Sequence, residues 1–346
     1  MAASPSTPGS TGPATIARIA EETGVSVTTV SKVLNGRSDV APATRARVEA
    51  SLERHSYIRR YRREPTGLQQ VDLVFHEFES VWAMQIIIGV HAVTAAEGVD
   101  MILTQLGGRH RPPQQWLEGV LARRPTGVLF VLSNLSEAQQ RLLASRSIPF
   151  VLIDTDGTTS PSVPTVGSNN WSGGLVATRH LLELGHRRVA IIAGPTDVLC
   201  SRARIAGYRS AHEEADLPVD PELVRHGNFH LDAGFRHGCE LLDRPDRPTA
   251  IFAGSDMQAL GVLRAARQLG LSVPRDLSVV GYDDLPLAEW VGPSLTTVRQ
   301  PLREMAGAAT RMLLALARGE KPQSTRIDLA TELIVRESTA AAPAHP

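Results

Sequence analysis

The sequence predicts a protein of two unlike parts: a small all-α domain, then an α/β core of two doubly wound lobes with parallel sheets. The chain has 346 residues, which is too long for one compact hydrophobic core. Apolar residues recur at helical spacing near the N-terminus, whereas short continuous apolar runs alternate with helical stretches from Val71 onward. Continuous apolar strands between helices are typical of buried parallel sheets, and roughly 270 residues of this pattern suit two lobes.

Composition narrows the class of protein further. Hydrophobic residues make up 42% and charged residues 21% of the chain, as in soluble globular proteins. The net charge is zero, but residues 14–64 carry ten cationic against six anionic side chains, a net charge of +4. A basic end on a neutral chain indicates local contact with phosphates. Cys200 and Cys239 have no metal-ligand spacing, so we predict no metal site, while one disulfide bridge stays open.

The N-terminal residues and the lack of a long apolar run predict where in the cell the protein is found. Residues 1–13 are rich in Ser, Thr, Pro and Gly, and we expect a disordered arm there. They lack the layout of a secretory signal, and no run of about 18 apolar residues could span a membrane. We therefore expect a cytoplasmic protein with no membrane partner.

Residues 15–35 predict a helix-turn-helix. Inward positions fall on Ile16, Ala20, Val30 and Val33, and the small Ala20 lets two helices approach closely. Gly24 suits the turn between them, and Ser26 suits the N-cap of the second helix. Such a second helix enters the major groove of DNA. The alternative is an ordinary helical hairpin.

A third helix and a linker complete the N-terminal part. We expect a helix from about residue 42 to 55, in which Val48 and Leu52 close the small core. The helical domain would then span residues 14–57. The segment 58–70 is strongly basic and is interrupted by Pro65 and Gly67, which predicts a linker.

The alternation of expected strands and helices is clearest in the core. Strands are expected at 71–75, 100–105, 127–132, 150–154, 188–194, 250–255 and 277–284, and helices at 84–97, 171–184, 202–215 and 257–269. Three of these strands end in polar residues: Asp154, Ser255 with Asp256, and Asp283 with Asp284. Ligands in such folds bind beyond the carboxyl ends of strands, although each of these residues alone is more typical of a helix N-cap than of a ligand contact.

At this point the chain resembles the lactose-repressor (LacI/GalR) family of bacterial transcription regulators. The resemblance covers nearly all of residues 14–338. The motifs that carry it are TIARIAEETGVSVTTVSKVLNG (15–36), TRARV (44–48), HLLELGHRRVAIIAGP (180–195), RIAGY (204–208), FAGSDMQALG (252–261) and DLSVVGYDDLPLAEWVGPSLTTVRQP (276–301).

The resemblance implies a DNA-binding head, a hinge and a core like a periplasmic sugar-binding protein. The chain would cross between the core lobes three times, with an N-lobe of about 71–168 and 299–327 and a C-lobe of about 169–298 and 328–338, followed by a tail at 339–346. It also implies a homodimer on pseudo-palindromic operator DNA. Because STAAAPAHP at the C-terminus has no apolar heptad, we expect no tetramer.

Carried over to this sequence, the resemblance places Val27 and Thr28 against base edges. Lys32 stands where the family usually has Arg, which can grip guanine with two bonds, whereas Lys offers a flexible point charge. Ser26, Thr29 and Ser31 would cap the helix or contact phosphates. The predicted DNA-binding set comprises Thr15, Ser26, Val27, Thr28, Thr29, Ser31, Lys32, Asn35, Arg59, Arg60, Arg62 and Arg63.

The linker departs from the family pattern. The family's minor-groove Leu falls on Thr66, and Pro65 would disrupt a hinge helix. Our hypothesis is that the four arginines of the linker instead grip phosphates or a narrow minor groove electrostatically.

The resemblance also implies an effector site between the lobes. Asp154 and Asp283 would accept hydrogen bonds from ligand hydroxyls, Arg204 would donate to the ligand, and Phe229 would stack on it. The remaining expected ligand contacts are Ser80, Trp82, Met84, Asn169 and Asp256. Two alternatives stay open: Trp82 as a core residue, and Arg204 as part of an ion pair between lobes.

These observations predict a transcription regulator, by default a repressor that an inducing sugar releases from its operator, with a corepressor response as the alternative. No cofactor is expected. The sequence lacks the G-x-S-x-G, phosphate-loop and H-E-x-x-H motifs of enzymes, so we expect no catalytic residues. A secreted solute-binding protein would share the core but not the helix-turn-helix.

Overall fold

The computed structural model describes residues 15–34, 40–55, 69–78, 80–108, 111–154, 160 and 162–343. The N-terminal part consists of α1 (Ile16–Thr23), α2 (Val27–Leu34) and α3 (Pro42–Arg54). Gly24 ends α1 in the left-handed conformation, with φ of 63°, as the turn requires. The three helices bury a core of Ile19, Ala20, Val30, Val33, Val40 and Val48. The predicted helix-turn-helix is therefore confirmed, although Ile19 rather than Ile16 is the fully buried residue of α1.

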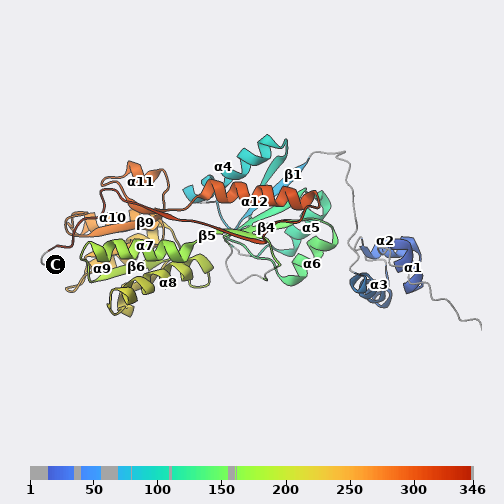
Figure 1. The fold of residues 1–346 in the computed structure, drawn as a ribbon, viewed down its shortest axis with the longest axis horizontal. Helices are drawn as coiled ribbons and strands as arrows, with labels where there is room; N and C mark the ends of the chain where they lie inside the picture. Colours follow the sequence, from blue (N-terminus) through green and yellow to red (C-terminus); the bar gives the residue numbers. More distant parts are fainter. Residues whose placement is uncertain are drawn as a thin grey trace, which may run out of the picture. The chain divides into compact units, whose positions relative to one another are not determined.

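The first lobe contains a six-stranded sheet in the order β11-β5-β4-β3-β1-β2, with all its neighbouring strands parallel. Its strands are β1 (Gln70–Phe75), β2 (Asp100–Gln105), β3 (Gly127–Val131), β4 (Phe150–Ile153), β5 (Thr165–Ser168) and β11 (Arg326–Leu329). Its helices are α4 (Val81–Ala96), α5 (Gln114–Arg123), α6 (Glu137–Ser145) and α12 (Leu302–Ala317). Helices α4 and α12 lie side by side on one face of the sheet (Figure 1).

The second lobe has another six-stranded sheet, in the order β12-β10-β9-β8-β6-β7. Its strands are β6 (Val189–Ala193), β7 (Val224–His226), β8 (Ala250–Ala253), β9 (Ser278–Asp283), β10 (Thr296–Arg299) and β12 (Glu332–Ile334). Only β12 runs antiparallel to its neighbour, β10, among the strand pairs that the structure describes. The helices are α7 (Asn170–Glu183), α8 (Leu199–Glu214), α9 (Leu231–Leu242), α10 (Asp256–Gln268) and α11 (Leu287–Trp290).

Successive side chains along the strands of the second lobe point to opposite faces of its sheet, and helices cover both faces. Val189, Ile191 and Ala193 of β6 pack toward α7 and α8, whereas Ala190 and Ile192 pack toward α9 and α10. A strand covered on both faces has to be apolar at every position, which is why these strands were visible in the sequence. The predicted fold class is confirmed.

The chain passes between the lobes three times, after β5, β10 and β11. The crossing segments are tied together: Ser168 Oγ donates to Gln300 Oε1 at 2.6 Å, and the amide of Asn169 donates to the carbonyl of Leu329 at 2.8 Å. All four strands next to a crossing lie at the same edge of their sheets, so the opposite edges of the two lobes have no covalent connection.

Candidate functional site

The outward face of α2 carries the side chains predicted to read DNA. Val27 is 51% exposed, which is unusual for a large apolar side chain, and Thr28 beside it is also exposed. The hydroxyl of Ser26 accepts from the amide of Thr29 at 3.1 Å and so caps α2. This capping fixes the start of α2 and the direction of Val27 and Thr28.

The other predicted DNA contacts divide into three groups. Thr15 caps α1 by accepting from the amide of Arg18 at 3.3 Å. Thr29 and Lys32 line a surface hollow that also includes residues from the start of α3, and Ser31 is half-buried on α2. Asn35 and the four linker arginines, Arg59, Arg60, Arg62 and Arg63, lie outside the described residues.

Arg204 is the centre of the polar cluster between the core lobes. It lies on α8, is only 4% exposed, and donates from Nε to Asn170 Oδ1 at 2.9 Å and from a terminal nitrogen to the carbonyl of Gly254. Its guanidinium carbon lies 3.6 Å from the centre of the Tyr282 ring and 5.4 Å from that of Phe229. Stacking and hydrogen bonding together compensate for burying this charge.

Two buried carboxyl groups, one from each lobe, belong to the same cluster. Asp154 follows β4 and accepts from Asn170 Nδ2 at 3.5 Å, while Asp283 ends β9 and accepts from Gln300 Nε2 at 2.6 Å. Burial raises the pKa of both carboxyls, that of Asp283 to about 7, and the positive charge of Arg204 partly opposes this rise. Both carboxyls therefore interact with the same guanidinium, Asp283 from within the second lobe and Asp154 from across the lobe boundary.

The nearby thiol takes no part in this chemistry. Cys200 lies one turn before Arg204 on α8, and burial raises the pKa of its thiol to about 12. Cys200 and Cys239 are both free, so the disulfide that the sequence left open is not formed.

Phe229 and Asp256 are also close to Arg204 or Asp283, but in different ways. Phe229 has a positive φ of 67°, and Ser255 Oγ donates to its carbonyl at 2.7 Å. Asp256 is fully buried and uses both carboxyl oxygens within the protein, accepting from Thr297 Oγ1 at 2.5 Å and from the amide of Leu285 at 2.7 Å. Its complete burial and these two bonds direct the Asp256 carboxyl to contacts within the protein.

Of the four other predicted ligand contacts, three have local roles in the structure and one, Met84, is exposed. Ser80 caps α4 by accepting from the amide of Ala83, and Asn169 is exposed and caps α7 by accepting from the amide of Ser172. Trp82 is half-buried and packs on the apolar core of the first lobe, while Met84 is 53% exposed on α4.

Several residues of the cluster were not predicted. Asn170, rather than its neighbour Asn169, joins Asp154 to Arg204. Gln300 joins Asp283 to Ser168, and Tyr282 stacks on the guanidinium. A further contact joins the lobes, from His230 Nε2 before α9 to Glu77 Oε1 after β1, at 2.8 Å.

Two negative findings apply to the described part of the chain. No group of three or more His, Cys, Asp or Glu side chains among the described residues is arranged to hold a metal ion. No helix within the described ranges is long and apolar enough to cross a membrane.

A helix-turn-helix head together with a two-lobed α/β core defines a ligand-responsive DNA-binding regulator, and comparison with known proteins supports this class. Residues 15–60 match the model of bacterial regulatory proteins of the lacI family, and residues 178–339 match that of the periplasmic binding protein-like domain. The regulator CelR of Thermobifida fusca is 35% identical over 94% of this chain and 98% of its own length. The repressor PurR of Escherichia coli is 33% identical over 95% and 98%, respectively. The chain belongs to the lacI family of bacterial transcription regulators.

Solved structures agree with this assignment. A transcriptional regulator CelR–cellobiose complex superposes with a TM-score of 0.71 at 33% identity, covering 94% of this chain and 99% of that one. The lac repressor dimer bound to operator and the anti-inducer ONPF superposes with a TM-score of 0.69 at 26% identity, covering 95% and 100%. The described fold is thus that of a DNA-binding regulator with an effector-binding core.

Proposed function

We propose that this regulator is a repressor whose effector is a sugar bound at Arg204, Asp154 and Asp283. The observation that carries the proposal is one buried guanidinium that interacts electrostatically with carboxyls from both lobes and lies 5.4 Å from the centre of the Phe229 ring. Guanidinium donors and carboxylate acceptors suit the paired hydroxyls of a sugar, and an aromatic ring suits its apolar face. The cellobiose complex of the similar regulator CelR supports the same class of ligand.

The way the site is built also suggests how the effector acts. Asp154 belongs to the first lobe and Asp283 to the second, so a ligand that contacts both carboxyls stabilises one relative arrangement of the lobes. We infer that sugar binding favours the arrangement that releases DNA. A corepressor would instead favour the DNA-binding arrangement.

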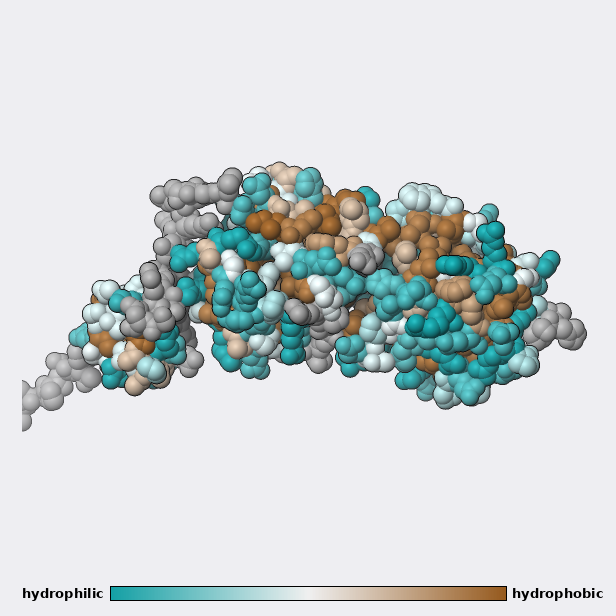
Figure 2. Space-filling model, turned by 180° about the vertical axis from the view of Figure 1, so that it is seen from behind, coloured by the Kyte–Doolittle hydropathy of each residue, from teal (hydrophilic) through white to brown (hydrophobic). Residues whose placement is uncertain are grey.

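We propose further that the regulator acts as a homodimer on a pseudo-palindromic operator. Val81, Met84 and Ile88 form an exposed apolar stripe on α4, and Leu103 on the neighbouring edge strand β2 is also exposed. Hydrophobic side chains gather along the side of the first lobe where α4 lies (Figure 2). Such a patch is typical of an interaction surface, and the similar lac repressor is a dimer on its operator. Val27, Thr28 and Lys32 would then read each half-site, with the linker arginines contacting phosphates.

A thermal-shift screen tests the class of effector. Full-length protein is heated with a panel of mono- and disaccharides including cellobiose, and in parallel with purine bases and nucleosides. The proposal predicts that at least one sugar raises the melting temperature, and that Arg204→Ala abolishes that rise. If no sugar changes the melting temperature and a purine or nucleoside raises it, the proposed class of effector is wrong.

A further inference from the structure

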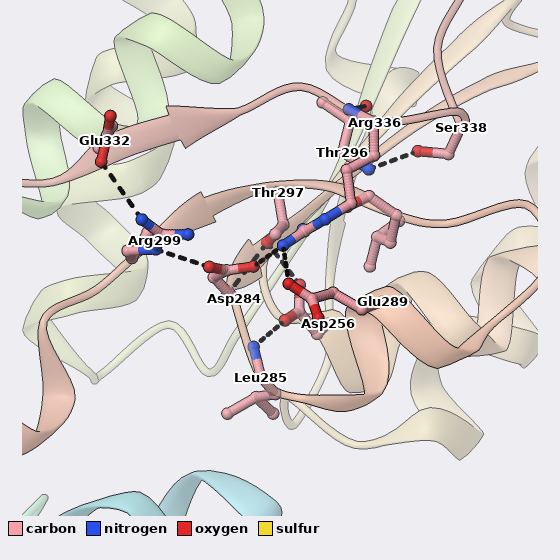
Figure 3. A network of polar contacts seen from close by, with 11 residues as sticks. Asp256, Asp284, Leu285, Glu289, Thr296, Thr297, Arg299, Glu332, Arg336 and Ser338 are labelled. Carbon is pink, nitrogen blue, oxygen red and sulfur yellow. Dashed lines mark hydrogen bonds and ion pairs between the residues drawn. The ribbon is translucent and has the colours of Figure 1, made fainter.

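The end of β9 has an unusual backbone that aims two successive carboxyls in different directions. Asp283 and Asp284 both have positive φ, 117° and 55°, in the region that favours glycine. The Asp283 carboxyl accepts from Gln300. The Asp284 carboxyl instead accepts from Arg299 and Arg336, each at 2.7 Å (Figure 3). Such a conformation persists only where its surroundings hold it in place.

Asp256 makes hydrogen bonds that stabilise this backbone conformation. Its Oδ2 accepts directly from the amide of Leu285 at 2.7 Å. Its Oδ1 accepts from the hydroxyl of Thr297, and this hydroxyl accepts in turn from the amide of Asp284 at 3.4 Å (Figure 3). One carboxyl group on α10 therefore fixes two consecutive backbone amides of the turn.

A glycine on the neighbouring strand leaves room for the Asp256 carboxyl. Asp256 is fully buried, and a Cβ atom at Gly281 on β9 would collide with its Oδ1. Glycine at position 281 thus lets the Asp256 carboxyl approach the strand closely enough to reach the turn.

From this geometry we propose that Asp256 is a positioning residue, which fixes the turn at 283–285 and thereby aims the Asp283 carboxyl at the effector without contacting the effector itself. The proposal rests on the proposed function in placing a sugar at Asp283. It differs from a direct role for Asp256, in which the ligand would bind the Asp256 carboxyl itself.

The two roles give opposite results for the conservative variant. Asn at 256 can accept from the Leu285 amide and donate to the Thr297 hydroxyl, so Asp256→Asn keeps the turn while removing the ionisable carboxyl. Asp256→Ala and Gly281→Ala break or displace both contacts. Val262→Ala, a core truncation on the same helix, is the matched control for loss of stability.

The test measures cellobiose affinity by calorimetry and solves ligand-free crystal structures of the same full-length variants. Asp256→Asn and Val262→Ala should bind cellobiose like wild type, whereas Asp256→Ala and Gly281→Ala should lose about tenfold or more in affinity. In ligand-free Asp256→Ala the contact between Asp283 and Gln300 should be broken.

The proposal is overturned if Asp256→Asn loses affinity as severely as Asp256→Ala, because the carboxyl group itself would then be needed. It is equally overturned if the turn is unchanged in ligand-free Asp256→Ala. If wild type does not bind cellobiose, that ligand is wrong for the proposed function, and the ligand-free structures alone decide the role of Asp256.

Discussion

Gln300 donates its side-chain amide to Asp283 at 2.6 Å and accepts from Ser168 at 2.6 Å through its carbonyl oxygen. Gln300 and Ser168 lie on two of the three segments that cross between the lobes, and Asp283 is a proposed ligand contact. A ligand hydroxyl that bound the Asp283 carboxyl would therefore share that carboxyl with a side chain of the crossing segments. This relationship offers a direct physical link between effector binding and lobe arrangement.

The first prediction concerns pH. The pKa of Asp283 is raised by burial to about 7 in the folded protein, against an ordinary value of 3.8. The folded state therefore binds the proton more tightly, and this contribution to stability is full below pH 3.8 and lost as the pH rises through about 7. Urea unfolding should give a smaller loss of stability between pH 5 and pH 8 for Asp283→Asn than for wild type.

Asp276→Asn is the control for that experiment. A hydrogen bond from Arg275 lowers the pKa of Asp276 to about 2, so its stabilising contribution is constant above about pH 5. An equal pH dependence in Asp283→Asn and wild type would contradict the assignment of the raised pKa to Asp283.

The second prediction concerns Arg204. Arg204→Ala leaves the buried Asp154 and Asp283 without their cation and should lower the free energy of unfolding by about 3–5 kcal/mol at pH 8. Arg204→Lys keeps the charge but loses the planar stacking on Tyr282, and should fall between Ala and wild type. Arg202→Ala, an exposed site on the same helix, should change stability by less than about 0.5 kcal/mol. If Arg204→Ala and Arg202→Ala had the same free energy of unfolding, Arg204 would not neutralise the buried carboxyls.

The third prediction concerns the contact between His230 and Glu77. It joins the lobes on the side of the sheets away from the strands next to the crossings. Glu77→Gln should weaken sugar binding by about 1 kcal/mol, the upper range for a partly exposed pair. Calorimetry with the sugar found by thermal shift checks this. Glu214→Gln breaks an exposed pair with Arg179 within the second lobe and should leave affinity unchanged.

The fourth prediction concerns Lys32. If Lys32 contacts a base edge, Lys32→Ala should cost about 1–3 kcal/mol and relax preference at one position of each half-site. Lys32→Arg should sharpen a preference for guanine there, because Arg can form two parallel bonds. Binding of operator variants by fluorescence anisotropy tests both changes. A uniform loss across all operator variants, with a shallower salt dependence, would indicate a phosphate contact instead.

The parts of the fold that sequence predicted share a physical cause. Strands β1, β6 and β8 are buried on both faces and therefore read as continuous apolar runs. Strands β7, β11 and β12 have three or four residues that are only partly buried or exposed, so they carry no comparable pattern. The positions of β11 and β12 follow from the last crossing of the chain between the lobes, whereas β7 pairs with β6 within the second lobe.

The candidate site, like the fold, was predicted in part from the sequence. Arg204 and Asp283 fell within family motifs, and the structure brings them into one cluster. The choice between Asn169 and Asn170 depends on where α7 begins, and a shift of one residue decides which side chain faces Arg204. The contact of His230 with Glu77 depends on how the two lobes face each other, which neither local sequence encodes.

The central claim, that a sugar at Arg204 and Asp283 controls DNA binding by the head, is tested most directly by one titration. Wild type and Arg204→Lys are bound to the same pseudo-palindromic operator fragment, and the sugar identified by thermal shift is added while anisotropy is recorded. The account predicts that the sugar releases wild type from the operator, while Arg204→Lys binds the operator normally and stays bound. An operator affinity of wild type that does not change at saturating sugar, or an equal response of the two proteins, would contradict it.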